Sequence, residues 1–203
     1  MNRILALAPH PDDIEIGCGG TLAVYAGQGA EIHLFVATDG GKGGDARVRK
    51  AEQEKAAELL GVKVVHWGGF EDTKLPAEDT LIHAIEDKVQ EIKPMIVLVN
   101  HHEDTHQDHR TMARAAHSAT RYVPNVLAYE TPTSSNFSPT VFMDIHDTLS
   151  DKLKALDAHA SQVERTNIQG LNIVGIALAT AHFRGVQGKI SCAEAFMPIR
   201  IRL

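Results

Sequence analysis

The sequence predicts an α/β fold built around a mostly parallel sheet. The order of the segments supports this class, and the length and composition support a single domain. Short apolar runs alternate with segments of helical composition over the first half of the chain, which is the order of parallel strands joined by right-handed helical crossovers. A length of 203 residues and a hydrophobic content of 43% suit one domain with a sizeable core, so we predict a single domain over residues 1–203.

The first half of the chain contains four expected strands with helices between them. Buried strands are expected as apolar runs, and helices as Ala-, Glu-, Lys- and Leu-rich segments that stop at glycine or before proline. The strands are predicted at residues 3–8, 31–38, 62–67 and 95–100, and the helices at residues 20–27, 46–60 and 79–91. Together they form a Rossmann-like three-layer arrangement, with a glycine-rich loop at residues 39–44.

The pattern loosens after residue 121. Three prolines frame a Ser- and Thr-rich loop at residues 130–138, which is a candidate lid or substrate wall. Beyond it, we predict strands at residues 141–145 and 189–196 and helices at residues 147–160 and 171–182.

Composition limits the classes of partner. A net charge of −6 and a pI near 6.0 disfavour a nucleic-acid binder and favour a small-molecule substrate. Cys18 and Cys192 are too few for a disulfide framework, which fits a reducing cytoplasm. The N-terminal apolar run is too short for a signal peptide, and no run approaches the roughly 18 apolar residues of a transmembrane segment. The sequence is compatible with a homo-oligomer.

The first chemical motif, His10-Pro11-Asp12-Asp13, follows the strand at residues 3–8. Ligands of open α/β sheets bind at the carboxyl ends of strands, where this motif lies. Adjacent carboxylates repel each other unless a cation or separate roles stabilise them. The alternative is a turn or helix cap, since Asp after Pro is common in turns. We favour a metal site.

The second motif lies in the histidine-rich run at residues 101–109, after the strand at residues 95–100. A helix that begins near Thr105 would place His106 and His109 on one face. Asp108 could brace a neighbouring imidazole, or it could only cap the helix. Because two parallel strands deliver both motifs to one sheet edge, we predict a mononuclear metal site with acid and base groups, as in a metal-dependent hydrolase.

These motifs resemble the LmbE/PIG-L family of zinc-dependent deacetylases, whose members remove acetyl from N-acetylglucosamine conjugates. The resemblance rests on the runs at residues 10–21 and 106–109 in combination. Weaker similarity at residues 49–62, 142–145 and 159–162 extends it over most of the chain.

The resemblance implies a role for each residue of the two motifs. Zinc, or another divalent ion such as Fe²⁺, is expected as the cofactor, and an N-acetylated amino-sugar conjugate as the substrate. The implied metal ligands are His10, Asp13 and His109, the implied base is Asp12, and the implied oxyanion donor is His106 oriented by Asp108.

Other residues carry weaker signals. Arg49 could form a surface ion pair with Glu52, and the resemblance favours a substrate contact instead. His101 and His102 could be extra ligands, but three ligands suffice, so we favour loop roles for them. Cys18 is expected to pack in the core. For His159, a cation at a helix C-terminus and a residue at the site edge both stay open.

Two other functions were weighed. Gly17-Cys18-Gly19-Gly20 suggests a non-enzymatic nucleotide-binding module, but residues 10–16 separate these glycines from the strand, so the G-x-G-x-x-G spacing fails. A metal-dependent phosphoesterase would need more convergent Arg or Lys side chains near the site. The sequence is compatible with three substrates: a glucosaminyl-thiol precursor, a glycolipid head group and a chitobiose unit.

Overall fold

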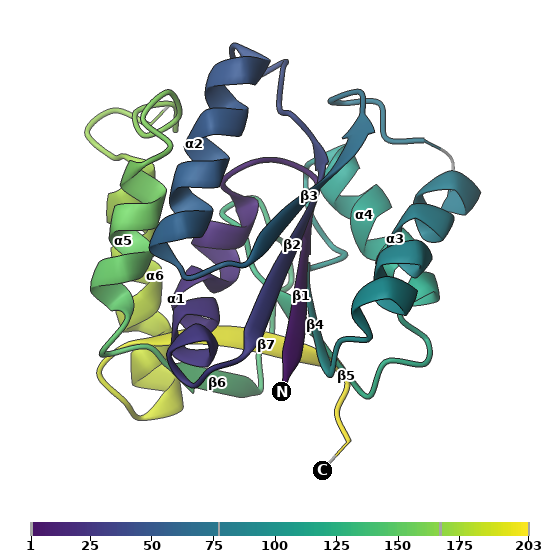
Figure 1. Ribbon diagram of the computed structural model, residues 1–203. Coiled ribbons are helices and arrows are strands. Elements are labelled where there is room, and N and C mark those ends of the chain that lie inside the picture. The colour runs from purple at the N-terminus through teal and green to yellow at the C-terminus, as the bar shows by residue number, and fades with distance from the viewer. Residues whose placement is uncertain (1, 77, 167, 203) are drawn as a thin grey trace.

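A twisted sheet forms the centre of the molecule (Figure 1). The computed structural model describes residues 2–76, 78–166 and 168–202. Within them the sheet has seven strands in the order β3-β2-β1-β4-β5-β7-β6. The first five are parallel, and β7 pairs antiparallel with both β5 and β6. The strands are β1 (Arg3–Ala8), β2 (Glu31–Thr38), β3 (Val64–Phe70), β4 (Ile96–Asn100), β5 (Asn125–Tyr129), β6 (Val141–Asp144) and β7 (Ala193–Arg200).

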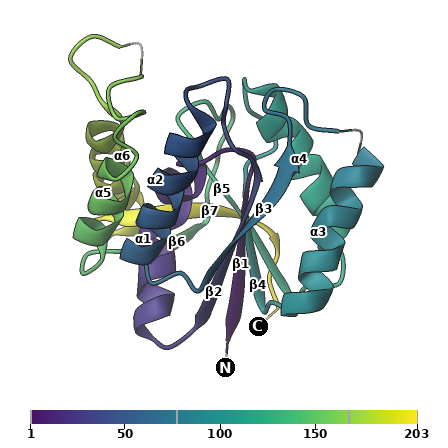
Figure 2. The ribbon, with the colours of Figure 1, turned by 45° about the horizontal axis from the view of Figure 1, so that its top comes forward.

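Helices cover both faces of this sheet and make three layers, which confirms the predicted fold class (Figures 1 and 2). One face carries α1 (Asp13–Gly27), α2 (Ala46–Leu59), α5 (Leu149–Asp157) and α6 (Ile173–Gly188). The other carries α3 (Glu78–Ile92) and α4 (Gln107–Ala119). Among the described residues, none of the helices is both long and apolar enough to cross a membrane.

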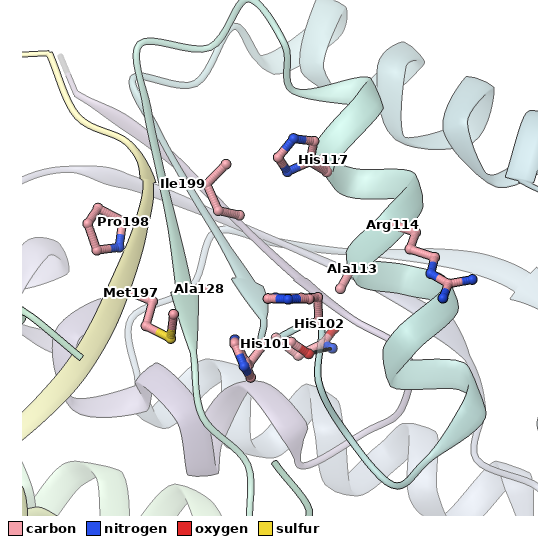
Figure 3. Close-up of a pocket in the computed structure, with 10 residues that line it drawn as sticks. His101, His102, Ala113, Arg114, His117, Ala128, Met197, Pro198 and Ile199 are labelled. Carbon is pink, nitrogen blue, oxygen red and sulfur yellow. Dashed lines mark hydrogen bonds between the residues drawn. The ribbon is translucent and has the colours of Figure 1, made fainter. Parts of the chain in front are cut away.

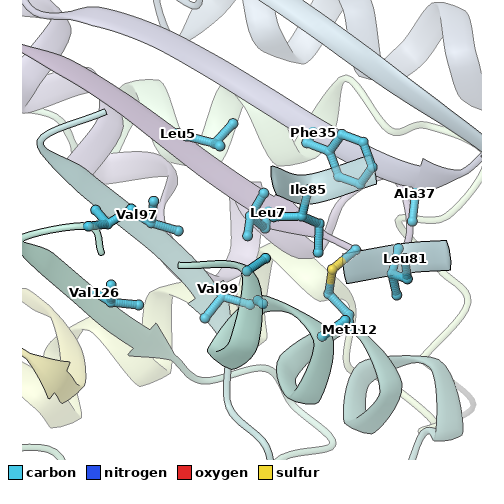
Figure 4. Packing of buried hydrophobic residues seen from close by; sticks show 14 of the residues in the cluster. Leu5, Leu7, Phe35, Ala37, Leu81, Ile85, Val97, Val99, Met112 and Val126 are labelled. Carbon is cyan, nitrogen blue, oxygen red and sulfur yellow. The ribbon is translucent and has the colours of Figure 1, made fainter. Parts of the chain in front are cut away.

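The central strands are buried on both faces, as a parallel sheet with two helical layers requires. Along β1, Leu5 and Leu7 pack with residues of α3 and α4, and Figure 4 shows them opposite Ile85 and Met112. The alternate residues of β1 face the other way and pack with α1. This explains why β1 and β2 are mostly apolar in sequence, and the structure confirms both strands with their predicted bounds.

The two motifs meet because β1 and β4 are neighbours at the point where the strand order reverses. The strands β2 and β3 are added on one side of β1, whereas β4 and β5 are added on its other side. The loops that leave the carboxyl ends of β1 and β4 therefore lie side by side, at the place where open α/β sheets bind ligands.

Residues 20–27 are helical as predicted, but α1 begins earlier, at Asp13, and has a kink at Cys18. The glycines on either side of this kink allow close packing. A Cβ on Gly17 would overlap the ring of Tyr129, and one on Gly20 would lie 3.0 Å from the Ile145 side chain. The prediction missed the first half of α1, because the need for small residues there arises from contacts that are distant in sequence.

The remaining differences lie mostly toward the C-terminus. The strand β5 was not predicted, since five residues next to Pro124 give a weak signal. The third strand runs to Phe70 rather than ending at residue 67. The helix α6 continues to Gly188, and the final strand consequently begins at Ala193 rather than at residue 189.

Candidate metal centre

The turn between β1 and α1 holds Asp12 in an unusual backbone conformation. Its φ of 84° lies in the left-handed region, which non-glycine residues seldom adopt, although Asp and Asn tolerate it best. Side chains of α2 stabilise this turn. The backbone N–H of Asp12 donates to Gln53 Oε1 at 3.2 Å, and Arg49 donates to Pro11 O at 2.9 Å and to Asp12 Oδ2 at 3.1 Å. The direction of the Asp12 carboxylate is therefore fixed.

Asp13 lies between two imidazoles, one from each motif. Its Oδ2 is 3.3 Å from His10 Nδ1, and its Oδ1 is 3.3 Å from His109 Nε2. The backbone N–H of His10 also donates to Asp13 Oδ2, which fixes the carboxylate. Ligand atoms about 2.0–2.2 Å from a tetrahedral zinc ion lie about 3.4 Å apart, close to these two distances. His10 also comes together with His106 and His109, and with Asp72 and Asp108, in groups whose ligand atoms lie within 4.8 Å of one another.

The remaining nitrogen of each of these imidazoles meets other carboxylates. His10 Nε2 lies 3.1 Å from Asp108 Oδ2 and 3.2 Å from Asp72 Oδ1. His109 Nδ1 lies 3.1 Å from Asp104 Oδ2. Metal-binding histidines typically donate their second ring N–H to a carboxylate, which fixes the tautomer and strengthens the ligand.

Asp72 and Asp104 were missed by the sequence analysis. Asp104 lies inside the histidine-rich run, and its carboxylate also accepts from the Thr131 hydroxyl at 2.8 Å, so the loop at residues 130–138 supports the centre. Asp72 follows β3 by two residues. Its position just after the carboxyl end of a strand could have identified it. The predicted strand ended at residue 67, which is too far from Asp72 to suggest this.

These carboxylates control the protonation of the imidazoles when no metal ion is bound. Burial alone lowers the pKa of His10, and the carboxylates of Asp108, Asp13 and Asp72 outweigh it and raise the pKa well above its usual value. Burial likewise opposes the effect of Asp13 and Asp104 on His109, whose pKa is raised to about 9. Both imidazoles are therefore protonated at neutral pH without the metal.

His106 caps the N-terminus of α4 with its ring. Its Nδ1 accepts a hydrogen bond from the Asp108 backbone N–H at 3.2 Å. Burial lowers its pKa, and the nearby rings of His10 and His109 lower it further, so the imidazole is neutral. Because Nδ1 is the acceptor, the ring proton is on Nε2, which makes that nitrogen a hydrogen-bond donor.

The structure corrects how Asp108 acts. We expected its carboxylate to orient His106, but the carboxylate lies against His10 and accepts from the Thr73 backbone N–H at 2.8 Å. Residue 108 orients His106 through its main chain instead. The neighbouring imidazole that the Asp108 carboxylate contacts is that of His10, at 3.1 Å.

A cavity of about 370 Å³ opens beside these residues and is lined by His10, Asp12 and His106. Burial raises the pKa of Asp12 to about 6; the Asp13 carboxylate adds to this effect, and the Arg49 guanidinium opposes it. Arg49 also lines the cavity, but its N–H groups bind Pro11 O, Gly40 O and Asp12. Its predicted contact with substrate stays a prediction.

His159 lies behind the centre. It is fully buried, and its Nε2 is 3.5 Å from Glu15 Oε2. Glu15 accepts from Gln53 Nε2 at 2.6 Å, so this chain of contacts reaches the Asp12 backbone through Gln53. Cys18 is fully buried in the apolar cluster between α1 and the sheet, as expected.

Comparison with known proteins agrees with the geometry. The family described as "PIG-L: GlcNAc-PI de-N-acetylase" matches residues 5–120. The uncharacterised deacetylase YaiS of Escherichia coli is 36% identical over 78% of this chain and 90% of its own length. The diacetylchitobiose deacetylase of Thermococcus kodakarensis is 31% identical over 80% of this chain and 70% of its own length.

Among solved structures, the N,N'-diacetylchitobiose deacetylase of Pyrococcus horikoshii superposes with a TM-score of 0.84. The match covers 98% of this chain and 84% of that one, at 25% identity. The sequence matches and the shared fold together establish that this chain belongs to the PIG-L family of deacetylases.

Proposed function

We propose that this protein is a zinc-dependent deacetylase that hydrolyses the N-acetyl group of an amino-sugar conjugate. The observation that carries the proposal is the Asp13 carboxylate between His10 Nδ1 and His109 Nε2, with Asp12 fixed beside it at the edge of a cavity. The names of the relatives, which include diacetylchitobiose deacetylases, support this reaction and this substrate class.

In this proposal His10, Asp13 and His109 hold the ion. Two neutral imidazoles and one carboxylate leave a centre of net charge +1. A zinc ion in such a centre acts as a Lewis acid, which lowers the pKa of water toward 7 and polarises an amide carbonyl. Asp108, Asp72 and Asp104 keep the ligand imidazoles in the required tautomer.

The proton transfers are assigned to side chains that line the cavity. Asp12 is the general base that takes a proton from the attacking water. His106 donates from Nε2 to the oxygen that becomes negative as the tetrahedral intermediate forms, and it can pass that proton to the leaving amine. The neutral state and Nε2 tautomer of His106 support this role.

Neither alternative function gains support from the geometry. The glycines of a nucleotide-binding module would lie in a turn, whereas here they lie within α1 and pack against Tyr129 and Ile145. A phosphoesterase would need several convergent cationic side chains, whereas Lys42 and Arg49 are the two Lys or Arg residues that line the described cavity, and the Arg49 guanidinium is bound to Gly40 O, Pro11 O and Asp12.

The substrate is proposed as a small conjugate, since the cavity is of the size that small-molecule sites usually have. We place the enzyme in the cytoplasm, because both Cys18 and Cys192 are free thiols, which a reducing compartment maintains.

A direct test combines metal analysis with an amine-release assay. Purified protein without an affinity tag should contain zinc and release amine from diacetylchitobiose or another N-acetylglucosamine conjugate. Chelation should abolish turnover, and added Zn²⁺ should restore it. Full activity in the metal-free protein, or no amine from any such conjugate, would overturn the proposal.

Replacing His106 should lower kcat strongly and change the melting temperature only slightly. The His106→Ala variant loses the oxyanion donor, and the loss of one such donor typically lowers kcat by about 10²–10³. It also loses a helix cap, so His106→Asn is the matched control, because Asn is a good N-cap with no donor at the position of Nε2. If turnover is restored in His106→Asn, the histidine is only a cap.

The Asp108→Asn variant should act on metal affinity rather than on His106. Its carboxylate braces His10, and loss of such a partner typically weakens metal binding by about 10–100-fold. Turnover at saturating Zn²⁺ should therefore recover to near the wild-type rate. A loss of kcat that excess metal does not reverse would show that Asp108 acts through His106 after all.

Zinc binding should release protons. Without metal, the raised pKa values of His10 and His109 keep both rings protonated at pH 7, whereas ligation needs neutral rings. We expect release of about one to two protons per ion, with affinity that rises as the pH increases toward 9. Calorimetry in buffers of different ionisation enthalpy measures this number, and a heat independent of the buffer would contradict it.

A further inference from the structure

The loop that follows β4 begins with three metal-binding residue types, His101, His102 and Glu103. One ligand atom from each lies within 4.8 Å of the other two. These residues belong neither to the proposed zinc ligands nor to their supporting carboxylates. We propose that His101, His102 and Glu103 form a second site for a divalent transition-metal ion such as Zn²⁺.

His101 carries the first argument. Its residue is only 1% exposed, yet neither Nδ1 nor Nε2 has a hydrogen-bond partner in the part of the chain that the structure describes. Buried polar atoms are nearly always paired, because an unpaired one loses its hydration without compensation. A ligand bound at this ring would remove that cost, and the ring of His102 lies 4.5 Å away, centroid to centroid.

A cavity lies beside two of the three proposed ligands, His101 and His102. It has a volume of about 340 Å³ and lies between α4 and the strands β5 and β7. Figure 3 shows the rings of His101 and His102 next to each other on its wall. Asn100 also lines the cavity, and its buried Oδ1 has no partner among the described residues. A water molecule on the ion could donate to that oxygen, as water does at many buried polar groups.

The other two ligands give the ion a route from solvent. The side chains of His102 and Glu103 are 62% and 48% exposed. Glu103 is held in place because its Oε2 accepts from Asn136 Nδ2 at 2.7 Å. Two imidazoles with one carboxylate suit zinc, nickel or copper, whereas Mg²⁺ and Ca²⁺ prefer sites made only of oxygen ligands.

This site is separate from the catalytic centre but adjoins it through one side chain. The amide of Asn100 donates to His101 O at 3.0 Å and to His109 O at 2.8 Å. An ion on His101 would thus stabilise the loop that leads to Asp104 and His106. Its binding nevertheless uses no ligand of the first centre, so the two ions can be removed one at a time.

Counting the ions tests the proposal. Tag-free, metal-free protein is titrated with Zn²⁺ in equilibrium dialysis, with metal content measured by mass spectrometry. The wild type should bind two equivalents, and His102→Ala and Glu103→Gln should each bind one. Both substituted side chains are largely exposed, so circular dichroism should show an unchanged fold. The control His117→Ala, which alters the same cavity outside the cluster, should keep two.

The variant Asp13→Ala separates this proposal from the proposed function. It should lose the other equivalent and keep the one bound by His101, His102 and Glu103. A single equivalent in the wild type that Asp13→Ala removes would overturn the second site and leave the first intact. A single equivalent that only His102→Ala removes would support the second site and count against the proposed catalytic centre. Two equivalents retained in both His102→Ala and Glu103→Gln would also overturn the second site.

Discussion

Replacing Asp13 with alanine should remove both the catalytic metal and the activity. Each Asp13 oxygen faces one imidazole at 3.3 Å, so a single substitution removes a proposed ligand and the negative charge between His10 and His109. The affinity for the first zinc ion should fall by more than the roughly 10–100-fold that loss of an outer carboxylate causes. Competition with a chelating dye measures it, alongside the amine-release assay.

Two controls make this result specific. Asp147→Ala removes a carboxylate from an exposed position far along the chain and should keep both metal and activity. A thermal melt of metal-free Asp13→Ala shows whether the fold persists when two buried imidazoles lose their shared partner. If the folded variant binds the first ion as tightly as the wild type does, Asp13 is not a ligand.

The central strands of the sheet could be predicted because their local sequence alone identifies them. The strands β1 and β2 are buried on both sides, so they appear as mostly apolar runs, with His33 as the polar exception inside β2. The strand β5 is also buried in the sheet, but it has only five residues and follows a proline. Its pairing with β4 and β7, which is not local, is what makes it a strand.

The candidate site also contains residues that the sequence could predict and residues that only the fold brings together. Residues of the two motifs could be selected from the sequence, because His and Asp at the ends of adjacent parallel strands indicate a metal site. The supporting carboxylates could not be assigned. Which ring nitrogen meets Asp72, Asp104 or Asp108 depends on side-chain directions at a junction of three loops. The mistaken partner of Asp108 shows this limit, since the family resemblance implied His106, whereas the Asp108 carboxylate contacts His10.

Replacing Asp12 with asparagine should give an enzyme that keeps its metal and loses its base. The expected loss in kcat is on the order of 10²–10⁴, the usual contribution of a positioned general base. Asparagine matches aspartate in size and tolerates the left-handed backbone that Asp12 adopts at φ 84°. The contacts of Gln53 with the Asp12 backbone and of Arg49 with Pro11 O do not involve the carboxylate, so the turn should keep its shape.

This design separates a base from a positioning residue. A carboxylate that only oriented Arg49 or the turn would be largely replaced by an amide of the same shape, whose Oδ1 can still accept from the Arg49 guanidinium. The variant would then keep most of its turnover. Loss of the base, by contrast, should lower kcat while KM and zinc content stay near wild-type values, because neither the cavity nor the proposed ligands His10, Asp13 and His109 are altered. Turnover within a few-fold of wild type in metal-replete Asp12→Asn would remove Asp12 from the proposed mechanism and require another group to take the proton from water.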